Sequence, residues 1–117
     1  MTTRHAIVIG GTSGIGLETA RMLLEDGMAV TVWGSSPHTV SDCSRRHPSI
    51  VSHGNAYFMA ADLRNRVQVN NGYWEARDYF GPPSILVNCS ARCLPGPLLG
   101  GTIDRWDDTV AVNLTGQ

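Results

Sequence analysis

The 117-residue chain is long enough for one domain, residues 1–117, and too short for two. Its net charge of −1 and its 16% charged residues create no strong field for nucleic acid or for an anionic membrane, so neither partner is expected. The first apolar run, residues 6–9, is too short for a signal-peptide core or a membrane span. These features predict a soluble, cytoplasmic globular domain.

The first predicted strand is His5–Ile9, a continuously apolar run typical of a strand buried on both faces of a parallel sheet. A glycine-rich loop follows, and a helix is predicted from Gly14 to the glycine at position 27. The apolar residues at helical spacing in this helix are Ile15, Met22 and Leu23. Residues 29–33 are predicted to form the second strand.

Ser36-Pro37 has the signature of a helix start, a serine cap followed by proline, and Pro48 bounds that helix. We predict a polar connector at 49–55, a third strand at 56–60, and a helix at 67–80 that is weakened by Asn70-Asn71-Gly72. A fourth strand is predicted at 84–88, then a loop rich in Pro and Gly at 92–101. A last amphipathic helix carries Ile103, Trp106, Val110 and Leu114. This alternation of strands and helices predicts an α/β fold with a parallel sheet.

Residues 7–20 read IVIGGTSGIGLETA, a glycine-rich loop between the first strand and the first helix. Glycines in this position let the chain turn tightly and let a phosphate approach the N–H groups of the helix N-terminus. A Walker loop is excluded, because Leu-Glu follows Gly16 where Lys and Ser/Thr are required. The GxGxxG fingerprint is excluded by Thr19. The spacing that fits is GxxxGxG, at Gly10, Gly14 and Gly16.

This glycine spacing, within VIGGTSGIG, resembles that of the short-chain dehydrogenase/reductase family, whose fold is a Rossmann-type doubly wound parallel sheet that binds NAD or NADP. Asp62-Leu63 resembles the family's acidic pair that contacts the adenine ring. Asn88, in ILVNCSA, resembles the first residue of the family's Asn-Asn-Ala-Gly turn, and Asn113, in WDDTVAVNLTG, its catalytic asparagine, which fixes a relay water. The cofactor-binding residues implied by the resemblance are Gly10, Thr12, Ser13, Gly14, Ile15, Gly16, Ser35, Asp62, Leu63 and Asn88.

The chain departs from the family pattern at two of these motifs. Ile9 replaces the threonine before the first glycine, which removes a side-chain hydrogen bond but keeps the backbone path. Cys89, Ser90 and Ala91 replace Asn-Ala-Gly, and alanine tolerates a positive φ less well than glycine. We therefore expect the turn after Asn88 to be rebuilt.

The end of the second predicted strand favours NADP over NAD. An acidic residue there would bind the ribose hydroxyls and repel a 2′-phosphate, but the sequence has Gly34-Ser35-Ser36. A 2′-phosphate is therefore admissible, and serine hydroxyls could bond it. The arginine that NADP-preferring relatives often carry is missing at Ser13 and Ser35, and Arg45 and Arg46, the nearest basic residues, are interpreted as a solvated helix face.

The resemblance implies hydride transfer between the nicotinamide and a small carbonyl or alcohol substrate, with a tyrosine, a lysine four residues later and an upstream serine as catalysts. The lysine lowers the tyrosine pKa, and a tyrosine with a pKa near 10 would be a poor acid–base catalyst at neutral pH. All nine basic residues of this chain are arginines. The nearest match, Tyr73 and Arg77, comes before the fourth strand, and arginine cannot be assumed to replace lysine.

We therefore expect residues 1–117 to be the cofactor-binding part of a longer reductase, truncated after the fourth strand and the following helix and a homo-oligomer when complete. In the strand order 3-2-1-4, Ile85-Leu86-Val87 would form a bare apolar edge, which predicts self-association of the chain alone. The alternative is a non-catalytic dinucleotide-binding or interaction module. A downstream Ser and YxxxK in the gene would distinguish the two.

The cysteines suit a reducing compartment and no metal site. Cys43, Cys89 and Cys93 are odd in number and form no CxxC pair. Cys43, His47 and His53 are metal-ligand types, but their spacing matches no common zinc motif. Cys89 and Cys93 have no histidine nearby in the sequence that could activate them as nucleophiles, so we interpret them as lining the fourth strand and its loop.

Overall fold

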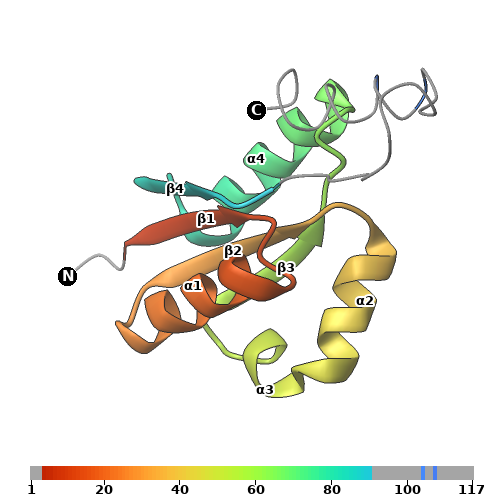
Figure 1. Cartoon of the computed structure of the whole chain (residues 1–117). Coiled ribbons are helices and arrows are strands. Elements are labelled where there is room, and N and C mark those ends of the chain that lie inside the picture. The colour runs from red at the N-terminus through yellow and green to blue at the C-terminus, as the bar shows by residue number, and fades with distance from the viewer. Residues whose placement is uncertain (1–3, 91–103, 105–106, 108–117) are drawn as a thin grey trace.

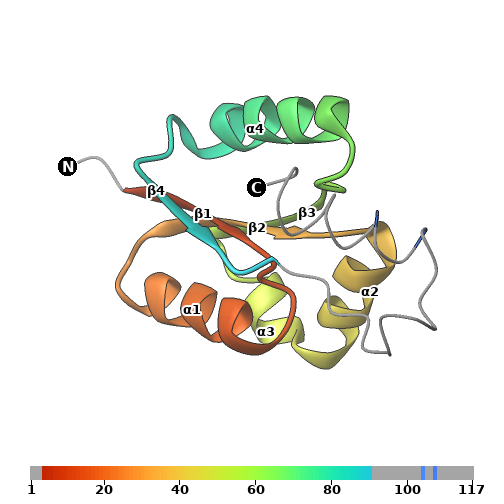
Figure 2. The same ribbon diagram turned by 45° about the horizontal axis from the view of Figure 1, so that its top comes forward.

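The computed structural model describes residues 4–90 together with Asp104 and Asp107. These residues include a four-stranded parallel sheet in the order β3-β2-β1-β4, as the sequence predicted. Helices α1, α2 and α3 cover one face of the sheet and α4 covers the other (Figures 1 and 2). The elements in chain order are β1 (His5–Ile9), α1 (Gly14–Glu25), β2 (Ala29–Gly34), α2 (Pro37–Arg46), α3 (Pro48–Val51), β3 (Ala56–Ala60), α4 (Arg66–Phe80) and β4 (Ile85–Asn88).

Strand β1 lies at the centre of the sheet, between β2 and β4. Ala6 pairs with Val30 on one side and with Ile85 on the other. All six residues of β2 and the first four of β1 are buried, because helices cover both faces of the sheet there. This double burial explains why both strands are continuous apolar runs rather than alternating ones. On β4, at the edge of the described sheet, Leu86 is 65% exposed.

The core is divided by the sheet into two layers. Beneath α1, Val8 and Val32 pack with Ala20 and Leu24 of the helix. Beneath α4, the indole of Trp33 packs with other buried residues of the strands and with Ala76 of the helix. Successive residues of β2 therefore serve opposite layers, as the strand period of two requires.

Helix α1 packs on the sheet mainly through residues other than the apolar ones noted in the sequence. Of those apolar residues, Ile15 is 80% exposed and Met22 is 56% exposed. The buried residues are Gly16, Leu17, Ala20 and Leu24. Small residues at two of these positions let the helix approach the strands closely, which a search for large apolar residues does not detect.

Helix α4 is continuous through Asn70-Asn71-Gly72 despite the low helix propensity of this segment. A Cβ on Gly72 would lie 3.1 Å from the Trp33 Cη2 atom and 3.3 Å from the Met59 Cε atom, so the missing side chain brings the helix close to the sheet. At the N-terminus of the helix, the Asn65 side chain accepts hydrogen bonds from two backbone N–H groups. Packing and capping thus offset the cost of an internal glycine of about 1 kcal/mol.

The segment predicted as a polar connector begins with a helical turn. Helix α3 spans Pro48–Val51, so Pro48 starts a new helix as well as bounding α2. Proline is favoured at the first position of a helix because it lacks only an N–H that would have no partner there. None of the described helices is long and apolar enough to cross a membrane.

A buried histidine connects three elements of the fold. The His5 Nδ1 atom lies 2.8 Å from the carbonyl oxygen of Gly81, after α4, and Nε2 lies 2.6 Å from the Thr31 hydroxyl on β2. Since a carbonyl only accepts, Nδ1 donates to it, and in the neutral ring Nε2 accepts from the Thr31 hydroxyl. Both side chains are buried, so these hydrogen bonds satisfy polar atoms that water does not reach.

Candidate functional site

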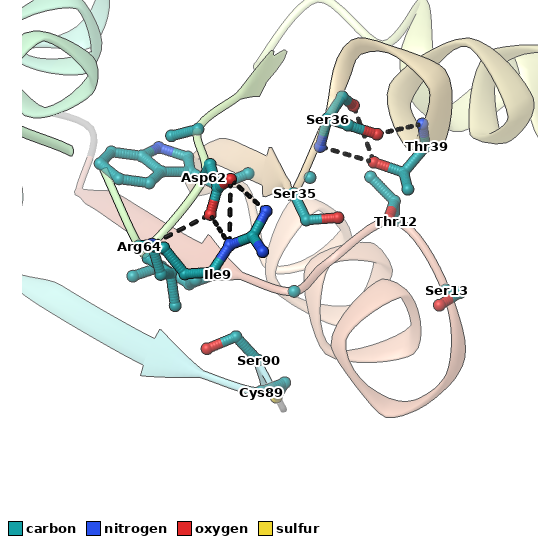
Figure 3. A pocket seen from close by; sticks show the side chains of 15 residues that line it. Ile9, Thr12, Ser13, Ser35, Ser36, Thr39, Asp62, Arg64, Cys89 and Ser90 are labelled. Atoms are coloured by element: carbon teal, nitrogen blue, oxygen red, sulfur yellow. Dashed lines mark hydrogen bonds and ion pairs between the residues drawn. The ribbon is translucent and has the colours of Figure 1, made fainter. Parts of the chain in front are cut away.

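A cleft of about 460 Å³ lies at the carboxyl ends of the strands (Figure 3). Its position is that of ligand sites in open α/β sheets, outside the strand ends at the point where the strand order reverses. The order reverses here between β1 and β4. The residues that line the cleft are Ile9, Gly10, Thr12, Ser13, Trp33, Gly34, Ser35, Ser36, Thr39, Ala61, Asp62, Leu63, Arg64, Cys89 and Ser90.

Two glycines bring the floor of the cleft together. Gly10 has a φ of +76°, and a Cβ on it would lie 2.8 Å from backbone atoms of Cys89 and Ser90. A Cβ on Gly16 would lie 2.2 Å from the carbonyl oxygen of Gly10. Both distances are too short for any side chain, so the glycine loop, the start of α1 and the chain after β4 meet only because these residues are glycines.

The N-terminus of α1 adjoins the cleft and favours an anion. Its N-cap residue, Ser13, is extended and its side chain makes no capping hydrogen bond. The first N–H groups of a helix have no partner within the helix, and the helix dipole places partial positive charge there. Thr12 and Ser13, both expected at a cofactor site, line the cleft at this end (Figure 3). The N-termini of helices are a common place for anions to bind in proteins.

Four of the expected cofactor residues do not line the cleft. One is Asn88, described below, and the other three are Gly14, Ile15 and Gly16, which form the first turn of α1. Gly16 allows the start of α1 to pack against Gly10, as described above, and Gly14 has a φ of +56° with open space around it. The Ile15 side chain is 80% exposed. Their backbone N–H groups belong to the first turn of α1, where N–H groups have no partner within the helix.

The end of β2 supplies hydroxyl groups to the cleft. The Ser36 side chain caps α2: its Oγ accepts from the Thr39 backbone N–H at 3.3 Å, and the Thr39 hydroxyl accepts from the Ser36 N–H at 3.3 Å. This reciprocal pair confirms the predicted helix start. Ser35, one residue earlier, lines the cleft between this cap and the loop after β3 (Figure 3).

The loop after β3 places a carboxylate and a guanidinium in the wall of the cleft. Arg64 donates to Asp62 from Nε (3.0 Å to Oδ1) and from Nη2 (2.7 Å to Oδ2), and its backbone N–H donates to Oδ1 at 2.9 Å. The hydrogen bonds that Arg64 donates to Asp62, and then the charge of that carboxylate, raise the pKa of Arg64 above its usual value. Asp62 and Leu63 line the cleft as expected, and the Asp62 carboxylate assigned to adenine is paired with Arg64.

Sequence reasoning missed Arg64 and considered two other arginines instead. Arg45 and Arg46 both pair with Asp42 on α2 and do not line the cleft. Their interpretation as a solvated helix face is consistent with this placement. Arg64 was missed because we looked for a cation only at the glycine loop and near the end of β2, whereas it comes from the neighbouring strand. An arginine two residues after the expected Asp62 was the available signal.

Asn88 lies beside the cleft rather than in its wall. It lines an adjoining groove of about 390 Å³ on the α4 side, together with Leu63 and Trp33, which line both. The Asn88 side-chain oxygen accepts from the Ser90 N–H at 3.1 Å and from the Ser90 hydroxyl at 2.6 Å. The turn after β4 is thus built on this side chain. Ala91 and the predicted catalytic Asn113 lie outside the described residues, as does the predicted last helix apart from Asp104 and Asp107.

Among the described residues, no group of three or more His, Cys, Asp or Glu side chains could hold a metal ion. Cys43, one of the residues considered for such a site, is 1% exposed. Burial raises the pKa of its thiol, which disfavours the thiolate that binds metals.

A profile of the short chain dehydrogenase family matches residues 4–117. The chain belongs to the short chain dehydrogenase family. An uncharacterized oxidoreductase of Staphylococcus haemolyticus is 28% identical over 97% of this chain and 47% of its own length. A Streptomyces virginiae protein, named for a ketoacyl reductase of the monensin polyketide synthase, is 34% identical over 97% of this chain and 42% of its own.

Solved structures of the family share this fold. A single-residue variant of actinorhodin polyketide ketoreductase, crystallised with NADPH, superposes with a TM-score of 0.85 at 28% identity. The match covers 99% of this chain and 45% of that one. The chain thus spans a little under half the length of the curated relatives and of this structure. It has the oxidoreductase family's Rossmann-type fold in that portion.

Proposed function

We propose that this chain binds a nicotinamide dinucleotide in the cleft, and NADP in preference to NAD. The observation that carries the proposal is the close junction of Gly10, Gly16 and the chain after β4, which leaves the N-terminus of α1 beside the cleft. A polar cleft there suits the pyrophosphate of a dinucleotide. The presence of NADPH in the crystals of the actinorhodin ketoreductase variant supports the same choice of ligand.

The lining residues fit the parts of such a cofactor. Thr12, Ser13 and the first N–H groups of α1 would hold the pyrophosphate, Ser35 would face the adenosine ribose, and Asp62 and Leu63 the adenine ring. The preference for NADP is supported by the absence of a carboxylate at Ser35, the position after β2.

For the whole protein we propose hydride transfer between the cofactor and a small carbonyl or alcohol substrate, in a cytoplasmic homo-oligomer. The nicotinamide supplies or accepts the hydride when bound. Family resemblance assigns Asn113 to the catalytic machinery and proton transfer to a serine, a tyrosine and a lysine. These 117 residues contain no lysine, so for this portion alone we propose cofactor binding without turnover.

The test is calorimetric titration of the chain with NADPH and with NADH, repeated on two variants. Ser35→Asp places a carboxylate where the 2′-phosphate is expected, and Ser41→Asp makes the same charge change on α2, outside the cleft lining. We expect tighter binding of NADPH than of NADH by the wild type. We also expect S35D to raise the Kd for NADPH by about 10-fold or more, because like charges a few ångströms apart repel strongly.

Two results would contradict the proposal. Failure of the wild type to bind either dinucleotide would refute cofactor binding, and equal effects of S35D and S41D would refute the assignment of Ser35. An interaction module would be favoured by a whole protein that binds NADPH but oxidises it with none of a panel of aldehydes and ketones.

A further inference from the structure

Arg64 is the one cationic side chain among the described residues that line the cleft. Asp62 is the one anionic side chain in the same lining. Figure 3 shows the Arg64 guanidinium extending from the loop after β3 toward the side of the cleft that carries Ser35. The cation therefore comes from a different strand end than Ser35, which lines the same cleft.

The Arg64 side chain is held in this orientation. Asp62 accepts from the guanidinium through both carboxylate oxygens, at 3.0 Å and 2.7 Å. The loop is itself tied to α4, because the Asp62 backbone N–H donates to the Gln68 side chain at 2.9 Å. A guanidinium fixed in advance loses less side-chain entropy when it binds a ligand. A guanidinium carries its donors in a planar fork that matches the oxygens of both carboxylates and phosphates.

We propose that Arg64 recognises the 2′-phosphate of NADP and thereby sets the preference for NADP over NAD. This inference rests on the proposed function. In that arrangement the N-terminus of α1 serves the pyrophosphate, so a further phosphate on the ribose near Ser35 requires a second source of positive charge. Arg64 supplies it, with the planar donor geometry that suits phosphate oxygens. Asp62 acts here as a positioning residue for the guanidinium.

The test compares three variants of the full chain in titrations with NADPH and NADH. Arg64→Gln removes the charge, Arg64→Lys keeps the charge but loses the planar fork, and Arg66→Gln is the matched control. Arg66 is exposed, begins α4 and does not line the cleft. Circular dichroism verifies that each variant is folded.

We expect R64Q to raise the Kd for NADPH by about 10-fold or more, because losing hydrogen bonds to a charged group usually weakens binding by at least this factor. The Kd for NADH should change by less than about 2-fold, R64K should be intermediate, and R66Q should resemble the wild type. The same titrations can use two fragments of the cofactors. R64Q should raise the Kd for adenosine 2′,5′-bisphosphate much more than the Kd for adenosine 5′-monophosphate.

Each contrary result has a distinct meaning. If the wild type binds both dinucleotides but R64Q weakens them equally or leaves both unchanged, the role of Arg64 is refuted and cofactor binding stands. An R66Q variant that matches R64Q would also refute it, because the effect would then come from net charge. If the wild type binds neither dinucleotide, the proposed function fails and this inference fails with it.

Discussion

Replacing Gly10 by alanine tests how tightly the glycine loop packs against the end of β4. Gly10 has a φ of +76°, and an added Cβ would meet backbone atoms of Cys89 and Ser90 at 2.8 Å. Gly14 provides the matched comparison, because its φ of +56° is also positive but an added Cβ would meet nothing within 4 Å. The two alanine variants therefore share the backbone strain and differ in the contact.

The expected difference between the two variants follows from these geometries. A left-handed conformation costs a non-glycine residue about 1–2 kcal/mol, and both variants carry this cost. The loss of unfolded-state entropy on replacing Gly by Ala is also common to both. Overpacking against backbone adds about 1–3 kcal/mol for Gly10→Ala alone. We therefore expect G10A to lower the free energy of unfolding by about 1–3 kcal/mol more than G14A does.

The measurement is urea unfolding of wild type, G10A and G14A, followed by circular dichroism. Equal loss of stability in the two variants would refute the close contact between the glycine loop and the chain after β4. The cofactor titration adds a second comparison. Because G10A must displace the floor of the cleft, we expect it to weaken NADPH binding more than G14A does.

Two further predictions concern a buried hydrogen bond and an exposed ion pair. Thr31→Val should lower the free energy of unfolding by about 1–3 kcal/mol, because it leaves the buried His5 Nε2 without its partner. Thr19→Val, which removes an exposed hydroxyl, should lower it much less in the same urea assay. Equal losses of stability in the two variants would contradict the argument. The hydrogen bond from Arg45 holds the pKa of Asp42 below its ordinary value. The pair therefore stabilises the fold at pH values above the unfolded-state pKa of the carboxyl, and this stabilisation is lost as the pH falls through the folded-state pKa. Arg45→Gln should raise the Asp42 pKa in a carboxyl NMR titration, and an unchanged midpoint would count against that pairing.

Most of the element boundaries could be predicted because local signals were strong, whereas the strand order was expected from the resemblance to the family's fold. Continuous apolar runs marked β1 and β2 as strands covered on both faces, and Ser36-Pro37 marked the start of α2. Glycine spacing indicated where a phosphate could approach a helix end. Each of these signals depends on residues adjacent in the sequence.

The features that sequence reasoning did not predict depend instead on contacts between segments that are distant in the sequence. Gly16 and Ala20 are buried since α1 approaches the sheet closely, and no periodicity of large side chains reports such an approach. Gly72 is tolerated in α4 because it packs on Trp33, 39 positions earlier in the chain. Arg64 enters the cleft from β3, whereas the sequence argument looked for a cation near β2.

The central position of β1 has a consequence for the order in which the chain folds. The pairing of Ala6 with Val30 closes a loop of β1, α1 and β2 alone, whereas its pairing with Ile85 closes a much longer loop, which costs more chain entropy. Gly10 meets Cys89 and Ser90 only after that second pairing. The cleft therefore depends on the longest-range strand pairing of the described structure, and we expect it to form late in folding.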